Sequence, residues 1–250
     1  MTSPRPGISV VTICRNAADG LERTLESVRA QDYPALEHVV VDGASSDRSL
    51  ALLERCRRPG LHFTSEPDRG IAHAFNKGIA ASTAPWILML NAGDVFIGND
   101  ALRLLADAMK DSALLVSARA RCGSKVIPRY RIHDGVPLLF RAHLSHQATL
   151  VHRDLYARYG GYDESFRIRM DFDFFLKALP HEKLVFLDRE LVDFEPGGIS
   201  GRQFQLHWQE GRRALARQNL GFAARLQYEI AFCALSCERA LQAAMSAVRK

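Results

Sequence analysis

Apolar residues along the first half of the chain follow two patterns that alternate. Short runs of β-branched and other apolar residues are each followed by a segment whose apolar residues lie three or four positions apart. The first pattern is typical of buried strands and the second of amphipathic helices. We expect strands over 8–14, 37–41, 61–64, 86–90 and 114–118, helices capped by Asp19 and Asp47, and helices over 71–81 and 100–109. This alternation with short loops predicts an α/β fold: a mostly parallel sheet flanked by helices on both faces.

The alternation ends after about residue 119. Residues 120–147 hold glycines and prolines among basic and apolar residues, which predicts long active-site loops or short strands. Beyond them we expect strands over 148–151, 183–187 and 191–194, and helices over 153–159, 171–179, 202–218 and 222–248. The chain therefore divides into a predicted α/β domain over 1–200 and a basic, amphipathic helical extension over 201–250.

Composition fits this division. The chain has 250 residues, 47% of them hydrophobic and 24% charged, which suits one large α/β domain with an appendage. The net charge of +5 is concentrated near the C-terminus, and this asymmetry suits an anionic partner such as a membrane surface or a diphosphate. A solvated helix face is the alternative. The apolar face of the last helix favours docking on its own domain or on a second subunit, with contact with a membrane interface as the alternative.

The cysteines and the N-terminal sequence bear on the compartment. The five cysteines are scattered and have no zinc-ligand spacing, which favours reduced thiols in a reducing compartment. The apolar run Ile8–Cys14 is too short for a signal peptide, and no run approaches the length of a membrane span. We expect a cytoplasmic protein with peripheral contact at the inner membrane and no nucleic-acid partner.

Two predicted strands end in acidic turns. The strand over 37–41 leads into Asp42, and the strand over 86–90 leads into Asn91-Ala92-Gly93-Asp94. Ligands of open α/β sheets bind beyond the carboxyl ends of the strands. Asp42 is placed to accept hydrogen bonds from a nucleobase imide or a ribose hydroxyl. Asp94 is the candidate ligand of Mg²⁺ or Mn²⁺, because such an ion needs few protein oxygens when a diphosphate supplies others.

A third polar turn, over residues 66–70, leads into the helix over 71–81. Here Arg69 is suited to pair with a phosphate and Asp68 with a sugar hydroxyl. We expect Asn76, on the following helix, to lock this turn in place. Helix capping is the alternative role for Asp68.

Asp171 stands at the start of a predicted helix, next to aromatic residues. A carboxylate that is partly desolvated there is a candidate general base. Its alternative role is to cap the helix. His146 precedes a predicted strand, and we expect it to contact the phosphates or the acceptor.

Taken in order, these motifs resemble those of the family 2 inverting glycosyltransferases with the GT-A fold. The resemblance is nearest to the branch that builds bacterial exopolysaccharide, colanic-acid or O-antigen repeats. It covers about residues 8–200. The matching segments are 8–12, 41–47, 65–71, 76–80, 90–94, 146–149, 160–166 and 171–173.

For the donor, the resemblance implies a pocket at the ends of the first strands. Asp42 would contact the base of the nucleotide sugar, and Thr12 with the adjoining backbone would line the pocket. Asp68 and Arg69 would border the nucleoside and the diphosphate. His146 and Asn91 would complete the binding of the donor.

For the chemistry, the resemblance assigns Asp94 as the surviving acidic member of the metal-binding DxD element. Asp171 would deprotonate an acceptor hydroxyl, and the single displacement inverts the anomeric carbon. The chain departs from the family where Asn91 and Gly93 replace acids of the metal turn and where Met170 replaces the first acid of the Glu-Asp pair. The QxxRW element of processive synthases is absent, which favours one sugar per encounter.

The resulting hypothesis is a hexosyltransferase-type enzyme. It would move one sugar from a nucleotide sugar, with a UDP-sugar as first choice, to a polyprenyl-linked or glycan acceptor in cell-surface polysaccharide synthesis. One alternative is a nucleotide-sugar-binding protein that has lost catalysis and supports a partner transferase. Another is a receiver or flavodoxin-like module, which would leave the later motifs unexplained. A homodimer stays open.

Overall fold

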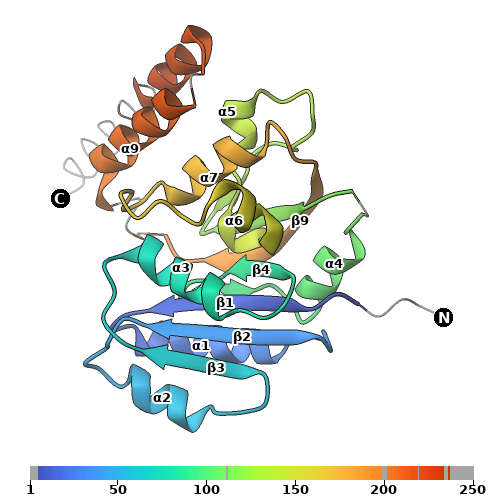
Figure 1. Ribbon diagram of the computed structural model, residues 1–250, viewed down its shortest axis with the longest axis vertical. Coiled ribbons are helices and arrows are strands. Elements are labelled where there is room, and N and C mark those ends of the chain that lie inside the picture. Colours follow the sequence, from blue (N-terminus) through green and yellow to red (C-terminus); the bar gives the residue numbers. More distant parts are fainter. Residues whose placement is uncertain are drawn as a thin grey trace.

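Four parallel strands form the N-terminal half of the sheet, in the order β3-β2-β1-β4 (Figure 1). They are β1 (Ile8–Cys14), β2 (Leu36–Asp42), β3 (Leu61–Ser65) and β4 (Trp86–Met89). The computed structural model describes residues 5–110, 112–196, 198, 202–218, 220–233 and 236. Within these residues, nine strands form one sheet. The parallel strands match the predicted apolar runs, because parallel strands are covered on both faces.

Helices cover both faces of this half. They are α1 (Ala18–Arg29), α2 (Ser49–Arg55) and α3 (Ile71–Ala81). Successive residues of β2 separate the faces: Val39 belongs to the cluster that contains Phe75 of α3, and Val40 to the cluster that contains Leu21 of α1 and Leu53 of α2. Successive side chains of a strand point to opposite faces of the sheet, so neighbouring residues of β2 pack against helices on opposite faces.

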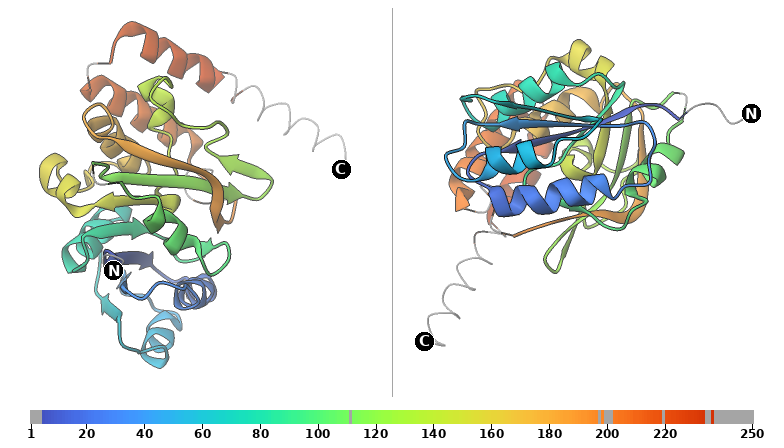
Figure 2. Two further views of the ribbon diagram at one scale, coloured as in Figure 1. Left: turned by 90° about the vertical axis from the view of Figure 1, so that its right-hand side faces the viewer. Right: turned by 90° about the horizontal axis from the view of Figure 1, so that it is seen from below.

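The second half of the sheet is mixed, where the apolar pattern had predicted a mostly parallel sheet. β8 (Thr149–His152) is antiparallel to both β4 and β6 (Leu115–Cys122). β6 is parallel to the long β9 (Leu184–Phe194), which lies beside it in Figure 2. Short strands β5 (Val95–Phe96) and β7 (Lys125–Ile127) pair antiparallel with β9 and β6. Parallel pairing needs a crossover connection between the strands, usually a helix, and α1, α2 and α3 supply these connections among β1–β4.

The remaining helices lie around this second half. They are α4 (Ala101–Asp107), α5 (Leu138–Arg141), the 3₁₀ helix η1 (His146–Ala148), α6 (Arg153–Tyr159), α7 (Met170–Ala178) and α9 (Phe204–Arg217), and residues 222–233 are also helical. α2 and α9 lie at opposite ends of the molecule (Figure 1). No helix among the described residues is long and apolar enough to cross a membrane.

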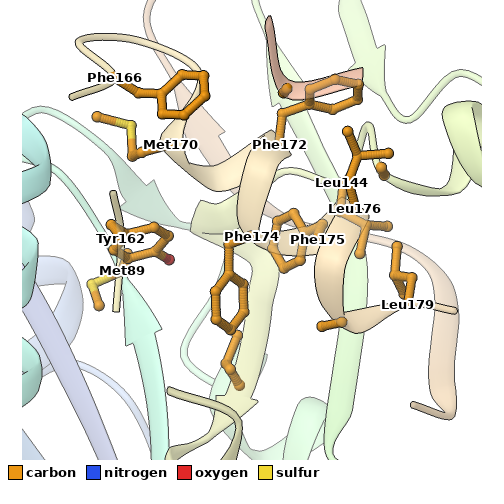
Figure 3. Close-up of a cluster of buried hydrophobic side chains, with 14 of the residues drawn as sticks. Met89, Leu144, Tyr162, Phe166, Met170, Phe172, Phe174, Phe175, Leu176 and Leu179 are labelled. Carbon is orange, nitrogen blue, oxygen red and sulfur yellow. The ribbon is translucent and has the colours of Figure 1, made fainter. Parts of the chain in front are cut away.

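α7 is buried on nearly all sides. Phe172, Phe174, Phe175 and Leu176 are each at most 1% exposed and belong to the largest hydrophobic cluster (Figure 3). A helix that is apolar all round is a core helix. The same cluster contains Trp208, Ala214, Leu215 and Tyr228. The C-terminal helices therefore pack on the same hydrophobic cluster as α7.

Several local predictions differ from the structure. β9 is one strand where two were expected, over 183–187 and 191–194. Asp19 does not cap α1; Asp47 Oδ2 accepts the Ala18 N–H at 3.1 Å, and Asp19 pairs with Arg48. Most of the C-terminal part of the helix predicted over 222–248 lies outside the described residues.

Candidate active site

Asp42 ties together the carboxyl ends of β1, β2 and β3. Its Oδ2 accepts hydrogen bonds from the Ser45 N–H (3.0 Å) and the Ser65 hydroxyl (2.5 Å). Its Oδ1 accepts from the Ser45 hydroxyl and from the Cys14 thiol (3.4 Å). Burial raises the pKa of Asp42, but these hydrogen bonds outweigh burial and hold the pKa below its usual value. The side chain is fully buried, so Asp42 orders the turn, and its contact with a nucleobase stays a prediction.

Gly43 and Asp68 are in close contact beside this turn. A Cβ added at Gly43 would clash with the Asp68 carboxylate, so glycine at this position lets the Asp68 side chain keep its place against the turn. Asp68 Oδ1 also accepts the Gly70 N–H at 2.9 Å. Arg69 forms an exposed ion pair with Glu164, with Nη2 and Oε2 2.6 Å apart. A phosphate would therefore compete with Glu164 for this guanidinium.

The Thr12 side chain belongs to the core. It is fully buried, and its hydroxyl lies 3.0 Å from Nε2 of His38. Burial lowers the pKa of His38 to about 3, so that ring is neutral. Any contribution of Thr12 to a ligand pocket comes from its backbone.

The turn after β4 is held from two sides. The Asn91 N–H donates to Asp94 Oδ2 at 3.1 Å. Thr24, on α1, accepts the Gly93 N–H at 2.9 Å and donates to the Asp94 carbonyl at 2.8 Å. Gly93 has a φ of 107°, which other residues rarely adopt. The turn is therefore preorganised, and Thr24 is a supporting residue that no local sequence signal indicates.

Asp94 is desolvated. Its exposed fraction is 7%, and burial raises its pKa to about 6, although nearby His146 and hydrogen bonds from Asn91 and Gln147 oppose the shift. A nearby cation stabilises the ionised form of a buried carboxylate. This environment suits a residue that holds a metal ion.

His146 joins the two ends of the site. Its Nδ1 lies 2.8 Å from Asp171 Oδ2, and its Nε2 lies 3.3 Å from Nδ2 of Asn91. Because the Asn91 amide donates to Nε2, the ring proton is on Nδ1 and is donated to Asp171. The sequence predicted His146 at the phosphates or the acceptor; in the structure it lies between the metal turn and the candidate base.

Asp171 is held in one orientation. Its second oxygen, Oδ1, accepts the Phe172 N–H at 2.7 Å. Burial raises its pKa, but the hydrogen bond from His146 and the charge of Arg169 outweigh burial and lower the pKa below its usual value. The side chain keeps 20% of its surface exposed. Asp171 is therefore ionised at neutral pH and accessible to a ligand.

A cavity of about 660 Å³ opens beside these groups. Asn91, Asp94 and His146 line its polar side. Ile71, Ile168, Met170 and Phe194 line an apolar side, and Lys125, Glu195 and Arg202 add charges. This volume is in the usual range for small-molecule sites. Asp42, Asp68, Arg69 and Asp171 are not part of this lining. Asp171 meets the cavity-lining residues through its hydrogen bond with His146, whereas Asp42, Asp68 and Arg69 form a second group at the ends of the first strands.

Asn76 has a different partner from the one predicted. Its Nδ2 donates to the Tyr162 carbonyl and its Oδ1 accepts the Tyr162 N–H, both at 2.8 Å. A Cβ at Gly161 would lie 2.6 Å from Asn76 Oδ1. Asn76 therefore holds the 160–166 segment, whereas the sequence had predicted that it locks the 66–70 turn.

The donor atoms present fit a hard divalent cation with few protein ligands. No group of three His, Cys, Asp or Glu side chains suited to a metal occurs in the described part of the chain. Asn91 Oδ1, beside Asp94, is buried and has no hydrogen-bond partner among the described residues. One carboxylate and one amide oxygen are enough for Mg²⁺ or Mn²⁺ when substrate phosphates complete the coordination.

Sequence comparison gives one family and several relatives. The sequence model described as "Glycosyl transferase family 2" matches residues 9–210. An uncharacterised glycosyltransferase of Mycobacterium tuberculosis (strain ATCC 25618 / H37Rv) is 33% identical over 210 residues, which cover 81% of this chain and 80% of the relative. A PGL/p-HBAD biosynthesis glycosyltransferase of Mycobacterium bovis (strain BCG / Pasteur 1173P2) is 28% identical, with 72% of each chain covered.

Solved structures share the fold. Residues 1–349 of S. aureus TarS, in complex with UDP-GlcNAc, superpose with a TM-score of 0.72 at 16% identity, covering 91% of this chain and 71% of that 1–349 chain. The mannosyltransferase PcManGT from Pyrobaculum calidifontis, in complex with GDP-Man and Mn²⁺, gives a TM-score of 0.66 at 21% identity, covering 98% and 81%. These similarities confirm the predicted GT-A fold.

Proposed function

The chain belongs to glycosyl transferase family 2, and on this premise we propose that it transfers one sugar from a nucleotide sugar, with inversion, to a hydroxyl of a polyprenyl-linked or glycan acceptor. The observation that carries the proposal is the cavity bordered by Asp94 and His146, with the ionised Asp171 hydrogen-bonded to His146. A hexosyltransferase of cell-surface polysaccharide synthesis, in the exopolysaccharide, colanic-acid or O-antigen branch, is the finer assignment. A relative named for succinoglycan biosynthesis, from Rhizobium meliloti, supports it over 41% of this chain.

In the proposed reaction Asp171 is the general base. It accepts the proton of the acceptor hydroxyl while that oxygen forms a bond to the anomeric carbon. The bond from the anomeric carbon to the diphosphate breaks in the same displacement, and the nucleoside diphosphate leaves, so the configuration inverts. The hydrogen bonds from His146 and Phe172 hold the Asp171 carboxylate in place for this step. Correct positioning of a catalytic group lowers the activation free energy substantially.

Asp94 and Asn91 Oδ1 are the groups that would hold Mg²⁺ or Mn²⁺. A divalent cation there supplies charge stabilisation for the departing diphosphate. The complex of PcManGT with GDP-Man and Mn²⁺ supports this assignment. We propose that the nucleoside binds at the strand ends around Asp42, Asp68 and Arg69, where the Thr12 backbone lines the pocket. The UDP-GlcNAc complex of TarS supports a UDP-sugar as first choice.

A panel of donors tests the proposal. UDP-, GDP- and dTDP-sugars are screened with Mn²⁺ by thermal shift, and each stabilising donor is then assayed for release of nucleoside diphosphate. We expect stabilisation by one nucleotide class and slow release with water as acceptor. Release from none of the donors would contradict the enzyme assignment. Stabilisation without release would favour the alternative, a nucleotide-sugar-binding partner of another transferase, for which the single acid of the metal turn is the motivating observation.

A second proposal concerns the membrane. Of the five exposed large hydrophobic residues among those described, three lie on the helix over 222–233 at four-residue spacing: Phe222 (79% exposed), Leu226 (45%) and Ile230 (60%). This spacing puts them on one helix face. Between residues 221 and 250, three arginines and one lysine outnumber two glutamates. We propose that this face docks on the anionic cytoplasmic leaflet, which would also place a polyprenyl-linked acceptor nearby.

Vesicle sedimentation tests the membrane proposal. The double variant Phe222→Ser, Ile230→Ser should no longer co-sediment with vesicles that contain anionic lipid. The control Leu50→Ser, an exposed apolar residue on α2, should bind like the wild type. Equal sedimentation of all three proteins would refute the proposal. A shift from dimer to monomer in the double variant, measured by light scattering, would instead assign the face to a homodimer.

A further inference from the structure

Both carboxylate oxygens of Glu210, on α9, accept hydrogen bonds from backbone N–H groups. Its exposed fraction is 5%. Its Oε1 accepts the Arg167 N–H at 2.7 Å, and its Oε2 accepts the N–H groups of Ile168 (2.9 Å) and Arg169 (3.0 Å). The sequence had placed Glu210 in a basic extension beyond the α/β domain. In the structure it reaches back by about forty residues to the entrance of α7.

Glu210 accepts the N–H groups of the N-cap residue of α7, Arg169, and of the two residues before it. The N-cap N–H is among the helix-start groups that have no partner within the helix. The Arg169 side chain makes no capping hydrogen bond, and the entrance of α7 is held from α9 instead. The hydrogen bonds to Glu210 are charge-assisted and therefore stronger than neutral ones. Its negative charge also favours the positive end of the α7 dipole.

Glu210 itself is firmly anchored. Trp208, two residues earlier, packs on Tyr228 with ring centroids 4.4 Å apart. Arg213 and Arg217 lie over the Phe166 ring at 4.6 and 5.1 Å. The two arginines therefore fix α9 against the segment that Glu210 holds, and Trp208 fixes α9 to the following helix.

Asp171 is the second residue of α7 and lies two residues after Arg169, the last of the three residues whose N–H groups Glu210 holds. We propose that Glu210 is a positioning residue for the transfer reaction: by holding the entrance of α7 from α9, it places the Asp171 carboxylate against His146, which lines the cavity. This inference rests on the proposed function. It makes α9 part of the catalytic apparatus, although Glu210 itself does not touch the substrate.

A graded series of variants with a matched control tests the inference. Glu210→Gln keeps one acceptor oxygen and Glu210→Ala keeps none. The control is Glu182→Gln. The Glu182 side chain is 8% exposed and accepts hydrogen bonds from Arg158 and Tyr159, remote from Asp171 in the fold. It therefore reproduces the loss of a buried carboxylate without changing the entrance of α7.

Kinetics of diphosphate release give the first readout. We expect kcat to fall in the order wild type, Glu210→Gln, Glu210→Ala, with about a 10²-fold loss for the alanine variant, since a misplacement of about 1 Å costs that much. The KM for the donor should stay within about twofold, because the donor contacts are unchanged. The acid limb of the pH profile should move to higher pH, since Asp171 would lose the hydrogen bonds that lower its pKa. Glu182→Gln should lower the melting temperature and leave kcat and the pH profile unchanged.

A spectroscopic readout does not depend on turnover. The ¹⁵N resonances of the His146 ring report its hydrogen bond to Asp171. They should shift in Glu210→Gln and stay in place in Glu182→Gln. Equal kcat, pH profile and ring resonances in these two variants would overturn the inference. If the wild type releases no diphosphate from any donor, the proposed function fails, and the ring resonances still decide whether Glu210 positions Asp171. If Glu210→Ala does not fold, Glu210→Gln decides.

Discussion

At the scale of single residues, the two acids of the site have opposite pKa shifts. Burial raises the pKa of Asp94 to about 6, whereas His146 and Arg169 hold the pKa of Asp171 below its usual value. Carboxylates whose environments push their pKa values apart take different roles. Asp171 is ready to accept a proton at neutral pH. Ionisation of Asp94 is unfavourable in its buried surroundings unless a cation is present, which suits a metal ligand and not a base.

The raised pKa of Asp94 predicts how metal binding depends on pH. The protonated carboxyl must lose its proton to bind Mn²⁺, so affinity should be constant above about pH 7 and fall by about tenfold per unit below pH 6. In the metal-free protein the sign is the reverse: the folded state binds this proton more tightly than the unfolded state, so that contribution to stability is lost as pH rises through about 6.

Calorimetric titration of Mn²⁺ in the presence of nucleoside diphosphate, at pH 5 to 8, measures the dependence. Asp94→Asn should bind weakly at every pH. An affinity that does not change with pH, or one that Asp94→Asn retains, would refute the assignment of Asp94 as the metal ligand.

At the scale of elements, helices hold the loops of the site through side-chain hydrogen bonds to the loop backbone. α1 holds the metal turn through Thr24, and α3 holds the 160–166 segment through Asn76. In both cases one side chain satisfies a backbone donor and a backbone acceptor of a distant loop. These loops therefore depend on helix positions that the local sequence of each loop does not reveal.

Thr24→Val tests the role of α1. The change keeps the shape of the side chain and leaves the Gly93 N–H without its buried acceptor, which should lower the free energy of unfolding by about 1–3 kcal/mol. It should also weaken Mn²⁺ binding, because the turn that carries Asp94 loses its support. Denaturant unfolding and calorimetry measure the two effects.

The control is Ser82→Ala. Ser82 is also buried, and its hydroxyl donates to the Gly78 carbonyl at the end of α3, away from the metal turn. It should lose some stability and bind Mn²⁺ like the wild type. The idea that α1 supports the turn fails if Thr24→Val keeps full affinity for Mn²⁺.

At the scale of the whole molecule, the C-terminal helices share the core of the α/β part. Trp208, Leu215 and Tyr228 belong to the same cluster as Phe172 and Phe174 of α7. Each large apolar side chain contributes about 1.5–3 kcal/mol when fully buried. Their sum is comparable with the about 5–15 kcal/mol by which a domain is usually stable.

A chain that ends at residue 200 should therefore not fold cooperatively. Thermal unfolding followed by near-ultraviolet circular dichroism is the measurement, with the full chain as reference. A truncated protein with a sharp transition at the temperature of the full chain would show that residues 1–200 are an independent domain after all.

The first half of the fold was predictable because its signals are local. Periodicity placed α3 at its observed bounds and β1–β4 within one residue of theirs. The second half depends on pairing between distant segments, so the short β5 was missed and β9 was divided. No periodicity reveals that a two-residue strand will find a partner about a hundred residues away.

The site divides in the same way. Asp94, His146 and Asp171 were predicted from motif positions, and the structure connects them through Asn91. Thr12 and Asp42 are buried by residues on neighbouring strands. Which strands become neighbours depends on the fold, so this burial could not be predicted from the local sequence. Thr24 and Glu210 carry no motif, because their partners are backbone groups that are brought to them only by the fold.

The central claim is that the Asp171 carboxylate, held by His146, drives sugar transfer. Its most direct test compares the release of nucleoside diphosphate from the stabilising donor, with Mn²⁺, by the wild type and by Asp171→Asn. Removing a general base should slow release by about 10²–10⁴-fold, while the Kd for the donor stays within about twofold because Asp171 does not hold the diphosphate. Equal rates of release from the two proteins would contradict the claim.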